Sequence, residues 1–393
     1  MSRSDDAGHY FQTSDSLATG ERRSAKAKNK HGKPIKLQSK ILAVLSGRAQ
    51  DGGIVYVAEA AGDVKRVDLE AGSSRSCRKA PLTAPVTSLA LAADAIYGGC
   101  WDKSIYGAPL GDASSKQPAQ WRPKLSGHTD FVKCLLSADL DGQPVLVSGG
   151  ADAAIIVWDL TTGKPIHKLK GPAKAIQDLI VDPLGLPEEL DEAPGGFVLF
   201  SASSDREIRR WYVGRCKAYE LPDSVETPIL AHETSVYKLR FDDDGDLWTA
   251  SADKTARHLV RSRGWEADIV LPHPDFVRDV VVTGERAGLV VTACRDEEVR
   301  VWDASSGDLV CTYSGHYEEE TGLALVAESG VVSVSIDGTV RRWSLERREI
   351  ARYLEEVERE KDGLGKEGGA EGEGGRLTAE EEAELAELMD DED

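Results

Sequence analysis

Residues 334–343 read VSIDGTVRRW, and this stretch decides the fold. Two short runs rich in β-branched residues stand on either side of Asp337-Gly338, a dipeptide that is typical of the tight turn in a β-hairpin. Trp343 ends the second run, six residues after the aspartate. The stretch predicts a strand, a turn and a second strand. The next question is whether the chain repeats this unit.

The spacing of Asp337 and Trp343 recurs along the chain. Four pairs have an aspartate followed six residues later by a tryptophan: Asp152/Trp158, Asp205/Trp211, Asp296/Trp302 and Asp337/Trp343. Weaker matches replace one or both residues: Asp253/Leu259, Asp102/Ala108 and Ala61/Val67. Successive matches lie 41 to 53 residues apart. Repeats of this length that are rich in short strands are typical of a β-propeller, in which each repeat is a four-stranded blade. We therefore expect seven blades.

Two further positions repeat within these units. A hydroxyl residue stands four residues before the aspartate in five units: Ser148, Ser201, Thr249, Thr292 and Ser333. A histidine stands 21 to 24 residues before it in four units: His128, His232, His273 and His316. Together with the Trp-Asp pairs, these marks resemble the WD-repeat β-propeller family from about residue 33 to 354. The resemblance implies an all-β fold, a seven-bladed WD-repeat β-propeller with a short helical acidic extension at the C-terminus.

In the family that the chain resembles, the four marked residues of one unit form a hydrogen-bonded network inside the blade. Three units carry the whole set: His128, Ser148, Asp152, Trp158; His273, Thr292, Asp296, Trp302; and His316, Ser333, Asp337, Trp343. Unit four has Pro172 in place of the histidine, and unit five has Leu259 in place of the tryptophan. Serine, histidine and aspartate also make up a nucleophilic triad, but a triad occurs once and this set recurs. We interpret the tetrads as structural and expect no catalytic residue, no metal site, no cofactor and no enzymatic activity.

A ring of blades must protect the edge at which it closes, because an open edge strand pairs with other chains. GKPIKLQ at 32–38 is similar to GKPIHKLK at 163–170, the expected outer strand of unit three. We favour 32–38 as the outer strand of the last blade. The alternative is 348–354, but residues 347–362 have apolar residues at helical spacing. The expected domains are a disordered basic arm at 1–31, the propeller at 32–354, and an acidic linker with a short helix at 355–393.

The net charge of −20 is distributed unevenly. Residues 1–40 carry nine Lys/Arg and four Asp/Glu, which is +5, and residues 355–393 carry four and seventeen, which is −13, so that −12 remains for the body. An acidic body argues against binding the phosphate backbone, so we expect no direct contact with nucleic acid. We interpret the basic head as a solvated disordered arm, and a weak nuclear signal or nucleic-acid contact is the alternative.

Targeting signals and cysteine spacing indicate the compartment. No run of roughly 18 apolar residues predicts a membrane span, and the N-terminus lacks the apolar stretch of a secretory signal. The six cysteines have no CxxC pair, so we interpret them as reduced and mostly buried. We expect a cytoplasmic and/or nuclear protein with a monomeric propeller and no contact with a membrane.

Partner-binding surfaces of propellers that resemble this one usually lie on the top face, at the rim formed by the loops after each histidine and before each turn aspartate. Exposed aromatic residues among charges are typical of protein-protein hot spots. The candidates on this rim are Trp101, Asp130, Phe131, Asp275, Phe276, Arg295, Tyr317 and Glu318. Packing between blades is the alternative for Phe131 and Phe276. Two long connections, 182–196 and 214–228, are either family-specific contacts or tolerated insertions.

The C-terminal segment predicts a second binding element. Thr378 and Glu381 form a capping box. Leu385, Leu388 and Met389 then place a narrow apolar stripe on an acidic helix that is too short to be stable alone in water. We favour a docking peptide for a partner over a disordered solubilising tail.

These observations favour a non-catalytic scaffold or adaptor that mediates protein-protein interactions within a multiprotein complex. One alternative is an acidic escort or assembly chaperone for a basic client such as a ribosomal protein or histone. Another is a substrate receptor of a ubiquitin ligase. The usual mark of such receptors, an arginine two residues after Trp-Asp, is absent, because Thr161 and Ser305 stand there.

Overall fold

A computed structural model of the chain describes residues 20, 23–24, 26–48, 51–77, 82–110, 124–185, 195–284, 288–326 and 329–370, with side chains up to 360. The chain divides into two compact units, Met1–Leu345 and Glu346–Asp393. In the described residues, the first unit contains every strand and the second contains the helix α3 (Arg347–Ala370). No helix in the described ranges combines the length and the hydrophobicity needed to span a bilayer.

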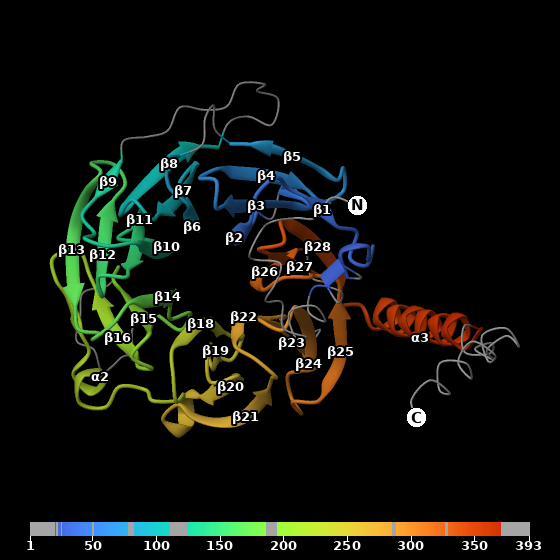
Figure 1. Cartoon of the computed structure of the whole chain (residues 1–393). Coiled ribbons are helices and arrows are strands. Elements are labelled where there is room, and N and C mark those ends of the chain that lie inside the picture. Colours follow the sequence, from blue (N-terminus) through green and yellow to red (C-terminus); the bar gives the residue numbers. More distant parts are fainter. Residues whose placement is uncertain are drawn as a thin grey trace, which may run out of the picture. The chain divides into compact units, whose positions relative to one another are not determined.

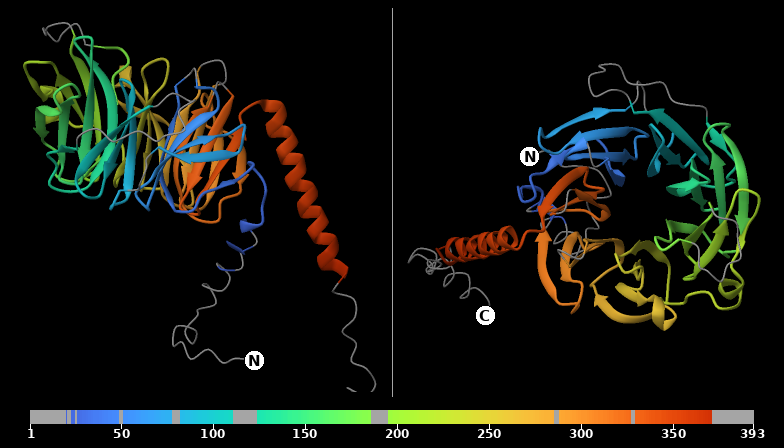
Figure 2. Two further views of the ribbon diagram at one scale, coloured as in Figure 1. Left: turned by 90° about the horizontal axis from the view of Figure 1, so that it is seen from above. Right: turned by 180° about the vertical axis from the view of Figure 1, so that it is seen from behind.

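The first unit is a closed ring of seven antiparallel four-stranded sheets, as predicted (Figures 1 and 2). From the inner to the outer strand, blades 1 to 3 are β2 (Ile41–Ser46), β3 (Ile54–Glu59), β4 (Val64–Asp68), β5 (Ser73–Ser76); β6 (Val86–Ala92), β7 (Ala95–Cys100), β8 (Ser104–Pro109), β9 (Leu125–Ser126); and β10 (Val132–Leu140), β11 (Gln143–Gly150), β12 (Ala154–Asp159), β13 (Lys164–Lys170). Blades 4 to 6 are β14 (Ile176–Val181), β15 (Phe197–Ser203), β16 (Ile208–Val213), β17 (Ala218–Glu220); β18 (Val236–Phe241), β19 (Leu247–Ser251), β20 (Thr255–Val260), β21 (Glu266–Pro272); and β22 (Val277–Val282), β23 (Leu289–Cys294), β24 (Glu298–Asp303), β25 (Leu309–Ser314). Blade 7 is β26 (Glu320–Val326), β27 (Gly330–Ser335), β28 (Thr339–Ser344) and β1 (Ile35–Lys36).

The turn of the opening hairpin recurs at the same place in every blade. The residue that follows the turn position has a positive φ, between 57° and 83°, in all seven: Gly62, Lys103, Ala153, Arg206, Lys254, Glu297 and Gly338. Five of these are not glycine, although this left-handed conformation favours glycine. In five blades the aspartate side chain accepts the N–H of the residue two positions later, at Ser104, Ala154, Glu207, Thr255 and Thr339. This bond stabilises the turn, and the shared geometry explains why the weakest matches still mark real blades.

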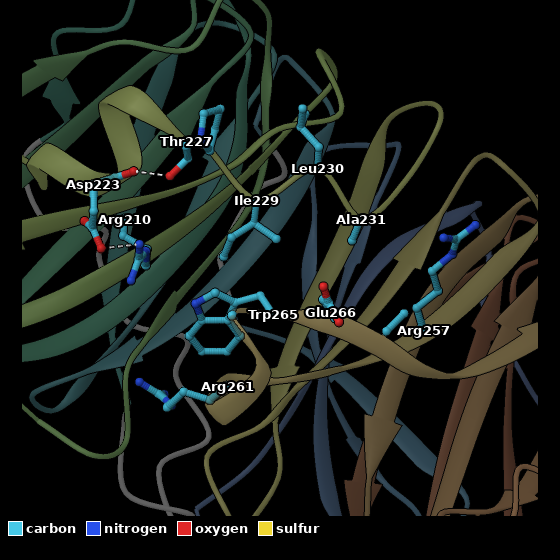
Figure 3. Close-up of a pocket in the computed structure, with 13 residues that line it drawn as sticks. Arg210, Asp223, Thr227, Ile229, Leu230, Ala231, Arg257, Arg261, Trp265 and Glu266 are labelled. Atoms are coloured by element: carbon cyan, nitrogen blue, oxygen red, sulfur yellow. Dashed lines mark hydrogen bonds and ion pairs between the residues drawn. The ribbon is translucent and has the colours of Figure 1, made fainter.

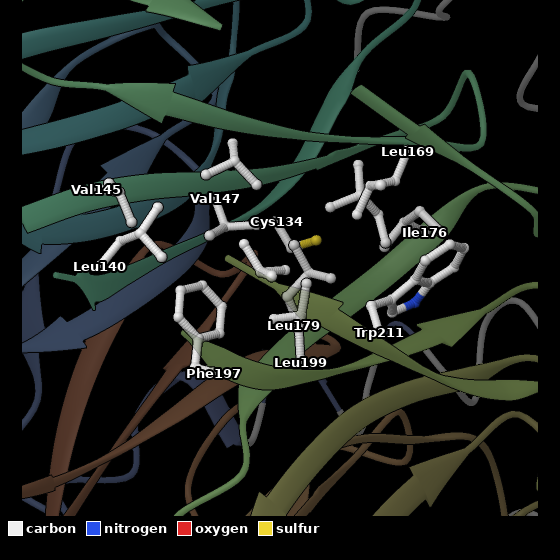
Figure 4. Close-up of a cluster of buried hydrophobic side chains, with 13 residues drawn as sticks. Cys134, Leu140, Val145, Val147, Leu169, Ile176, Leu179, Phe197, Leu199 and Trp211 are labelled. Carbon is white, nitrogen blue, oxygen red and sulfur yellow. The ribbon is translucent and has the colours of Figure 1, made fainter. Parts of the chain in front are cut away.

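The core lies between neighbouring blades. Figure 4 shows one such layer, in which Cys134 and Val147 of blade 3 meet Leu199, Phe197 and Trp211 of blade 4. Each blade buries the faces of its strands against the next blade, so the core repeats around the ring. The six cysteines are unpaired thiols; Cys100, Cys134, Cys294 and Cys311 are buried, Cys77 is half-buried and Cys216 is exposed. The prediction that the cysteines are mostly buried is thus confirmed, with exposed Cys216 as the exception.

The N-terminal strand closes the ring, which confirms the interpretation of 32–38. β1 is antiparallel to β28, with Ile35 opposite Val340, and the Leu37 N–H donates to the Gly338 carbonyl at 2.7 Å. The competing segment 348–354 belongs to α3. Because α3 begins at Arg347, the expected propeller boundary at residue 354 is wrong by about ten residues, and the last strand ends at Ser344.

The arm at 1–31 was expected to be disordered, and residues 1–19, 21–22 and 25 of it lie outside the described part of the chain. Its described part contacts the propeller: buried Arg341 donates to the His31 carbonyl, and the Asn29 amide donates to the Ser314 carbonyl at 3.2 Å. The long connection at 214–228 contains the outer strand β17 and the helix α2 (Pro222–Glu226). In the other connection, 182–196, residues 186–194 lie outside the described part of the chain.

Candidate functional site

The tetrad of blade 3 forms a chain of hydrogen bonds. The His128 ring donates from Nδ1 to Asp152 Oδ1 at 2.9 Å and accepts at Nε2 from the Ser148 hydroxyl at 2.7 Å. The Trp158 indole N–H donates to the same hydroxyl at 2.8 Å. Asp152 also accepts the Thr129 N–H at 2.8 Å. These polar groups satisfy one another inside the blade, where Ser148 and Trp158 are fully buried.

The other blades show how far this network tolerates substitution. Blade 7 repeats it with His316, Ser333, Asp337 and Trp343, at 2.7 to 3.0 Å. Blade 5 keeps the His232 bonds to Asp253 and Thr249 and lacks the indole. Blade 4 keeps the bond from Trp211 to Ser201 and the backbone bond from the Ala173 N–H to Asp205, both at 2.8 Å.

Blade 6 departs from the expected tetrad. His273 Nε2 and the Trp302 indole N–H contact Thr292 Oγ1 at 2.8 and 2.9 Å, but His273 Nδ1 donates to the Leu271 carbonyl instead of Asp296. Asp296 pairs with Arg300. In blades 3, 5 and 7 the backbone N–H after the histidine donates to the aspartate. Blade 6 has Pro274 there, which has no N–H. Because Pro274 cannot donate a backbone N–H, Asp296 lacks the partner that the aspartates of blades 3, 5 and 7 have, and its carboxylate pairs with Arg300 and not with His273.

Burial keeps the tetrad histidines neutral. Burial lowers the pKa of the His128 and His316 rings, although the neighbouring aspartates act in the opposite direction. For Asp152, burial would raise the pKa, but bonds from the Thr129 N–H and the His128 ring outweigh it, so that the pKa is lowered. His273 has no aspartate partner, and burial, assisted by Arg300, lowers its pKa to about 4.

The low pKa of His273 predicts a loss of stability in mild acid. The folded ring stays neutral while the unfolded ring, with a pKa near 6.5, takes up a proton, so the free energy of unfolding falls as the pH drops from about 6.5 toward 4. We expect His273→Gln to remove about 2 to 3 kcal/mol of this dependence between pH 7.5 and 4.5. Urea unfolding of both proteins at the two pH values measures it. A difference between the proteins that does not change with pH would contradict the assignment.

The candidate rim residues fall into two groups on the same face of the ring. In the first, Trp101 from the β7–β8 turn stacks on Phe131, which precedes β10, with ring centroids 5.1 Å apart and planes inclined by 20°. The pair joins blades 2 and 3, yet Trp101 remains 46% exposed and Phe131 40% exposed. Phe131 therefore packs between blades and faces solvent as well. Asp130 lies beside the pair, and its carboxylate accepts the Phe131 N–H at 2.8 Å.

The second group lies on blades 6 and 7. The Arg295 guanidinium lies over the half-buried Phe276 ring, 5.3 Å from its centroid, and approaches Asp275 at 4.0 Å. Tyr317 donates its hydroxyl to the Asp337 carbonyl at 3.2 Å, and Glu318 pairs with Arg23 at 2.9 Å. The structure therefore does not bring all rim candidates together. The remaining candidates, Leu385, Leu388 and Met389, lie outside the described residues.

A groove of about 690 Å³ between blades 4 and 5 was not predicted (Figure 3). Ile229, Leu230 and Trp265 supply its apolar lining. Its three arginines are already paired with acids of the chain: Arg210 with Asp223, Arg257 with Asp253, and Arg261 with Asp182. Because these charges are neutralised in place, we assign the groove no ligand. Its lining residues are spread over 58 positions of the sequence, and we find no local motif that marks them.

Sequence reasoning also missed an acidic cluster between blades 6 and 7. Glu297 and Glu298 follow the turn of blade 6, and Glu318 and Glu320 stand at the start of blade 7. The run RDEEVR at 295–300 is the sequence signal that could have indicated an acidic cluster at this place. Arg23 and Lys26 from the N-terminal segment contact this cluster.

Comparisons with known proteins agree with the repeat architecture. A family model described as "WD domain, G-beta repeat" matches residues 121–159 and 224–258. An uncharacterized WD repeat-containing protein of Schizosaccharomyces pombe is 33% identical over 402 residues, which cover 98% of each chain. Nuclear distribution protein nudF of Aspergillus niger is 29% identical over 53% of this chain and 45% of its own length. Pre-mRNA-processing factor 19 of Mus musculus is 27% identical over 50% of this chain and 36% of its own length.

A solved structure supports the fold. The crystal structure of the WD40 β-propeller domain of Doa1 matches with a TM-score of 0.62 and 19% identity, covering 79% of this chain and 94% of that chain. At this level of identity the match concerns the architecture alone.

Proposed function

The chain belongs to the WD-repeat family, and from that premise we propose that it is a non-catalytic scaffold or adaptor that binds a protein partner through the rim at blades 2 and 3. WD-repeat propellers are typically interaction domains without catalytic activity and generally mediate contacts between proteins. The observation that carries the proposal is the stacked pair of Trp101 and Phe131, which joins two blades and remains exposed.

The physical argument rests on the character of this pair. Aromatic side chains supply a large contact area with few rotatable bonds, so tryptophan and its neighbours dominate the binding energy of many interfaces. Stacking fixes each ring before a partner arrives, which lowers the entropy lost on binding. A tetrad cannot play this role because its members are buried and bonded to one another.

We expect Trp101→Ala combined with Phe131→Ala to reduce recovery of the main co-purifying protein by about tenfold or more, because hot-spot truncations commonly cost about 2 kcal/mol. Affinity purification of the full-length variants with quantitative mass spectrometry measures the loss. Leu309→Ala is the matched control, since Leu309 is 51% exposed but lies on the outer strand β25. The two variants should unfold at similar temperatures, and an unchanged set of partners in the double variant would refute the proposal.

A further inference from the structure

The seam between blades 6 and 7 carries a concentrated negative charge. We call Glu297, Glu298, Glu318 and Glu320 the acidic seam. The first two belong to the β23–β24 region of blade 6, and the last two to the entrance of β26 in blade 7. The side chains of Glu297 and Glu298 are largely buried. Carboxylates that are removed from water so close together repel one another, and such an arrangement is unfavourable without a cation.

Glu320 is the deepest member of the acidic seam. Its side chain is 1% exposed, and neither carboxyl oxygen makes a hydrogen bond within the described part of the chain. Burial raises its pKa well above the usual range, and the charges of Glu298 and Asp296 act in the same direction. With its pKa raised, Glu320 favours the neutral form, so the negative charge of the acidic seam comes from Glu297, Glu298 and Glu318, which pair with cations.

The chain itself supplies that positive charge. Lys26 Nζ lies 2.6 Å from Glu298 Oε1 and 3.2 Å from Glu297 Oε2, and Arg23 Nη1 lies 2.9 Å from Glu318 Oε1. These cations come from residues about 270 to 295 positions away in the sequence. The acidic seam therefore already holds two basic side chains, which come from helical residues three positions apart in the N-terminal segment.

The hold on this segment is weak at its N-terminal end. Arg23 is 42% exposed in its side chain, and partly exposed ion pairs contribute little to stability. Lys26 is held more firmly, because its side chain is largely buried between Glu297 and Glu298, and attachment continues at Asn29 and His31, whose carbonyls accept from Arg341. Tethering raises the effective concentration of Arg23 and Lys26 at the acidic seam to the millimolar range. A partner must therefore bind the seam more tightly than these two side chains do, which a segment with several lysines or arginines can achieve while the closing strand β1 stays in place.

We propose that the acidic seam is a docking site for a Lys/Arg-rich segment of a partner protein, and that Arg23 and Lys26 occupy it in cis until that partner displaces them. This proposal goes beyond the scaffold or adaptor role, because the acidic seam lies at blades 6 and 7 and not at blades 2 and 3, and because the proposal names the chemistry of the ligand. The carboxylates of the seam repel phosphate, so the site selects a basic protein segment and not a nucleic acid.

The test uses the full chain and a fluorescein-labelled peptide, GERRSAKAKNKHG, which is residues 20–32 of the chain itself. The double variant Arg23→Glu, Lys26→Glu empties the seam, and we expect it to bind the peptide about tenfold more tightly than the parent protein by fluorescence anisotropy. Adding Glu297→Gln and Glu298→Gln to the emptied protein should abolish the gain. Affinity in the emptied protein should also fall steeply with salt.

Matched controls separate this mechanism from a general change of charge. Lys28→Glu with Lys30→Glu makes the same change of charge on two exposed lysines of the same segment, and should leave peptide affinity at the parent level. Thermal unfolding of every variant shows whether the propeller remains folded. Equal affinity of parent and emptied protein, or a gain that survives loss of Glu297 and Glu298, would overturn the proposal. A parent protein that is dimeric in light scattering would show that the segment fills the seam of a second copy, and would overturn occupation in cis.

Discussion

A variant that lacks residues 1–38 is expected to lose on the order of 5 kcal/mol of folding free energy, a large share of the roughly 5–15 kcal/mol of an ordinary protein. The loss has three sources. Burial of Leu37 contributes about 2 kcal/mol. The backbone bonds at Leu37 and Arg342 contribute about 1 kcal/mol each. The bonds from Arg341 to the His31 and Asn29 carbonyls, in which the donor is charged, supply the rest.

Removal of β1 also exposes the edge of β28, so we expect a local effect in blade 7 in addition to the loss of overall stability. Without β1, the strand presents unpaired backbone groups that other chains can pair with, so we also expect association at high concentration. Hydrogen exchange should accelerate first in β26 to β28, and urea unfolding gives the change in stability. A variant that lacks only residues 1–22 is the control, because it keeps every segment contact that the structure describes from Arg23 onward. Equal stability of the two truncations would show that β1 does not close the ring.

The ring itself was predictable because its determinants are local. The turn at Asp337-Gly338 and the strands around it lie within ten residues, and the same pattern of turn and strand recurs in each blade. Blades that lack most of the marked residues still keep the turn geometry. In blade 2, for example, Lys103 adopts the same left-handed backbone conformation as Gly338 in blade 7. The position of β1 followed from its similarity to another outer strand, which is also a local property.

The detail of the tetrads was only partly predictable. The residue types in blade 6 match those of blades 3 and 7, yet Asp296 pairs with Arg300. An arginine four residues after the turn aspartate is no guide, because Arg341 occupies the same position in blade 7 and donates to the N-terminal segment. The informative signal was Pro274, which removes a backbone donor. The loss of one backbone N–H thus goes together with a different partner for the Asp296 carboxylate.

The rim was predictable residue by residue but not as a surface. Trp101 was identified as exposed from its place in a turn, whereas its stacking on Phe131 depends on how blade 2 meets blade 3. The acidic seam was still harder to predict from the sequence, because Lys26 and Glu298 are separated by 272 positions and meet only when the ring closes. Contacts between blades carry no short-range signature, so they emerge only from the assembled fold.

Ser148→Ala is expected to destabilise the protein by about 4 kcal/mol, and Ser201→Ala by about 2 kcal/mol. Both hydroxyls are fully buried, and each accepts an indole N–H at 2.8 Å, from Trp158 and Trp211 respectively. Ser148 also donates to His128 Nε2, whereas blade 4 has no histidine at that place. A buried polar group that loses its only hydrogen bond costs about 1 to 3 kcal/mol.

The two substitutions remove the same atom from neighbouring blades, so the difference between them isolates the histidine branch of the network. Urea unfolding under identical conditions measures it, with equal slopes required for the comparison. The slope of stability against pH offers a second readout: once the Ser148 hydroxyl is gone, His128 Nε2 loses its donor, and protonation of that ring in acid becomes less unfavourable. If Ser148→Ala and Ser201→Ala cost the same at pH 7 and respond equally to pH, the histidine adds nothing to the stability of the blade.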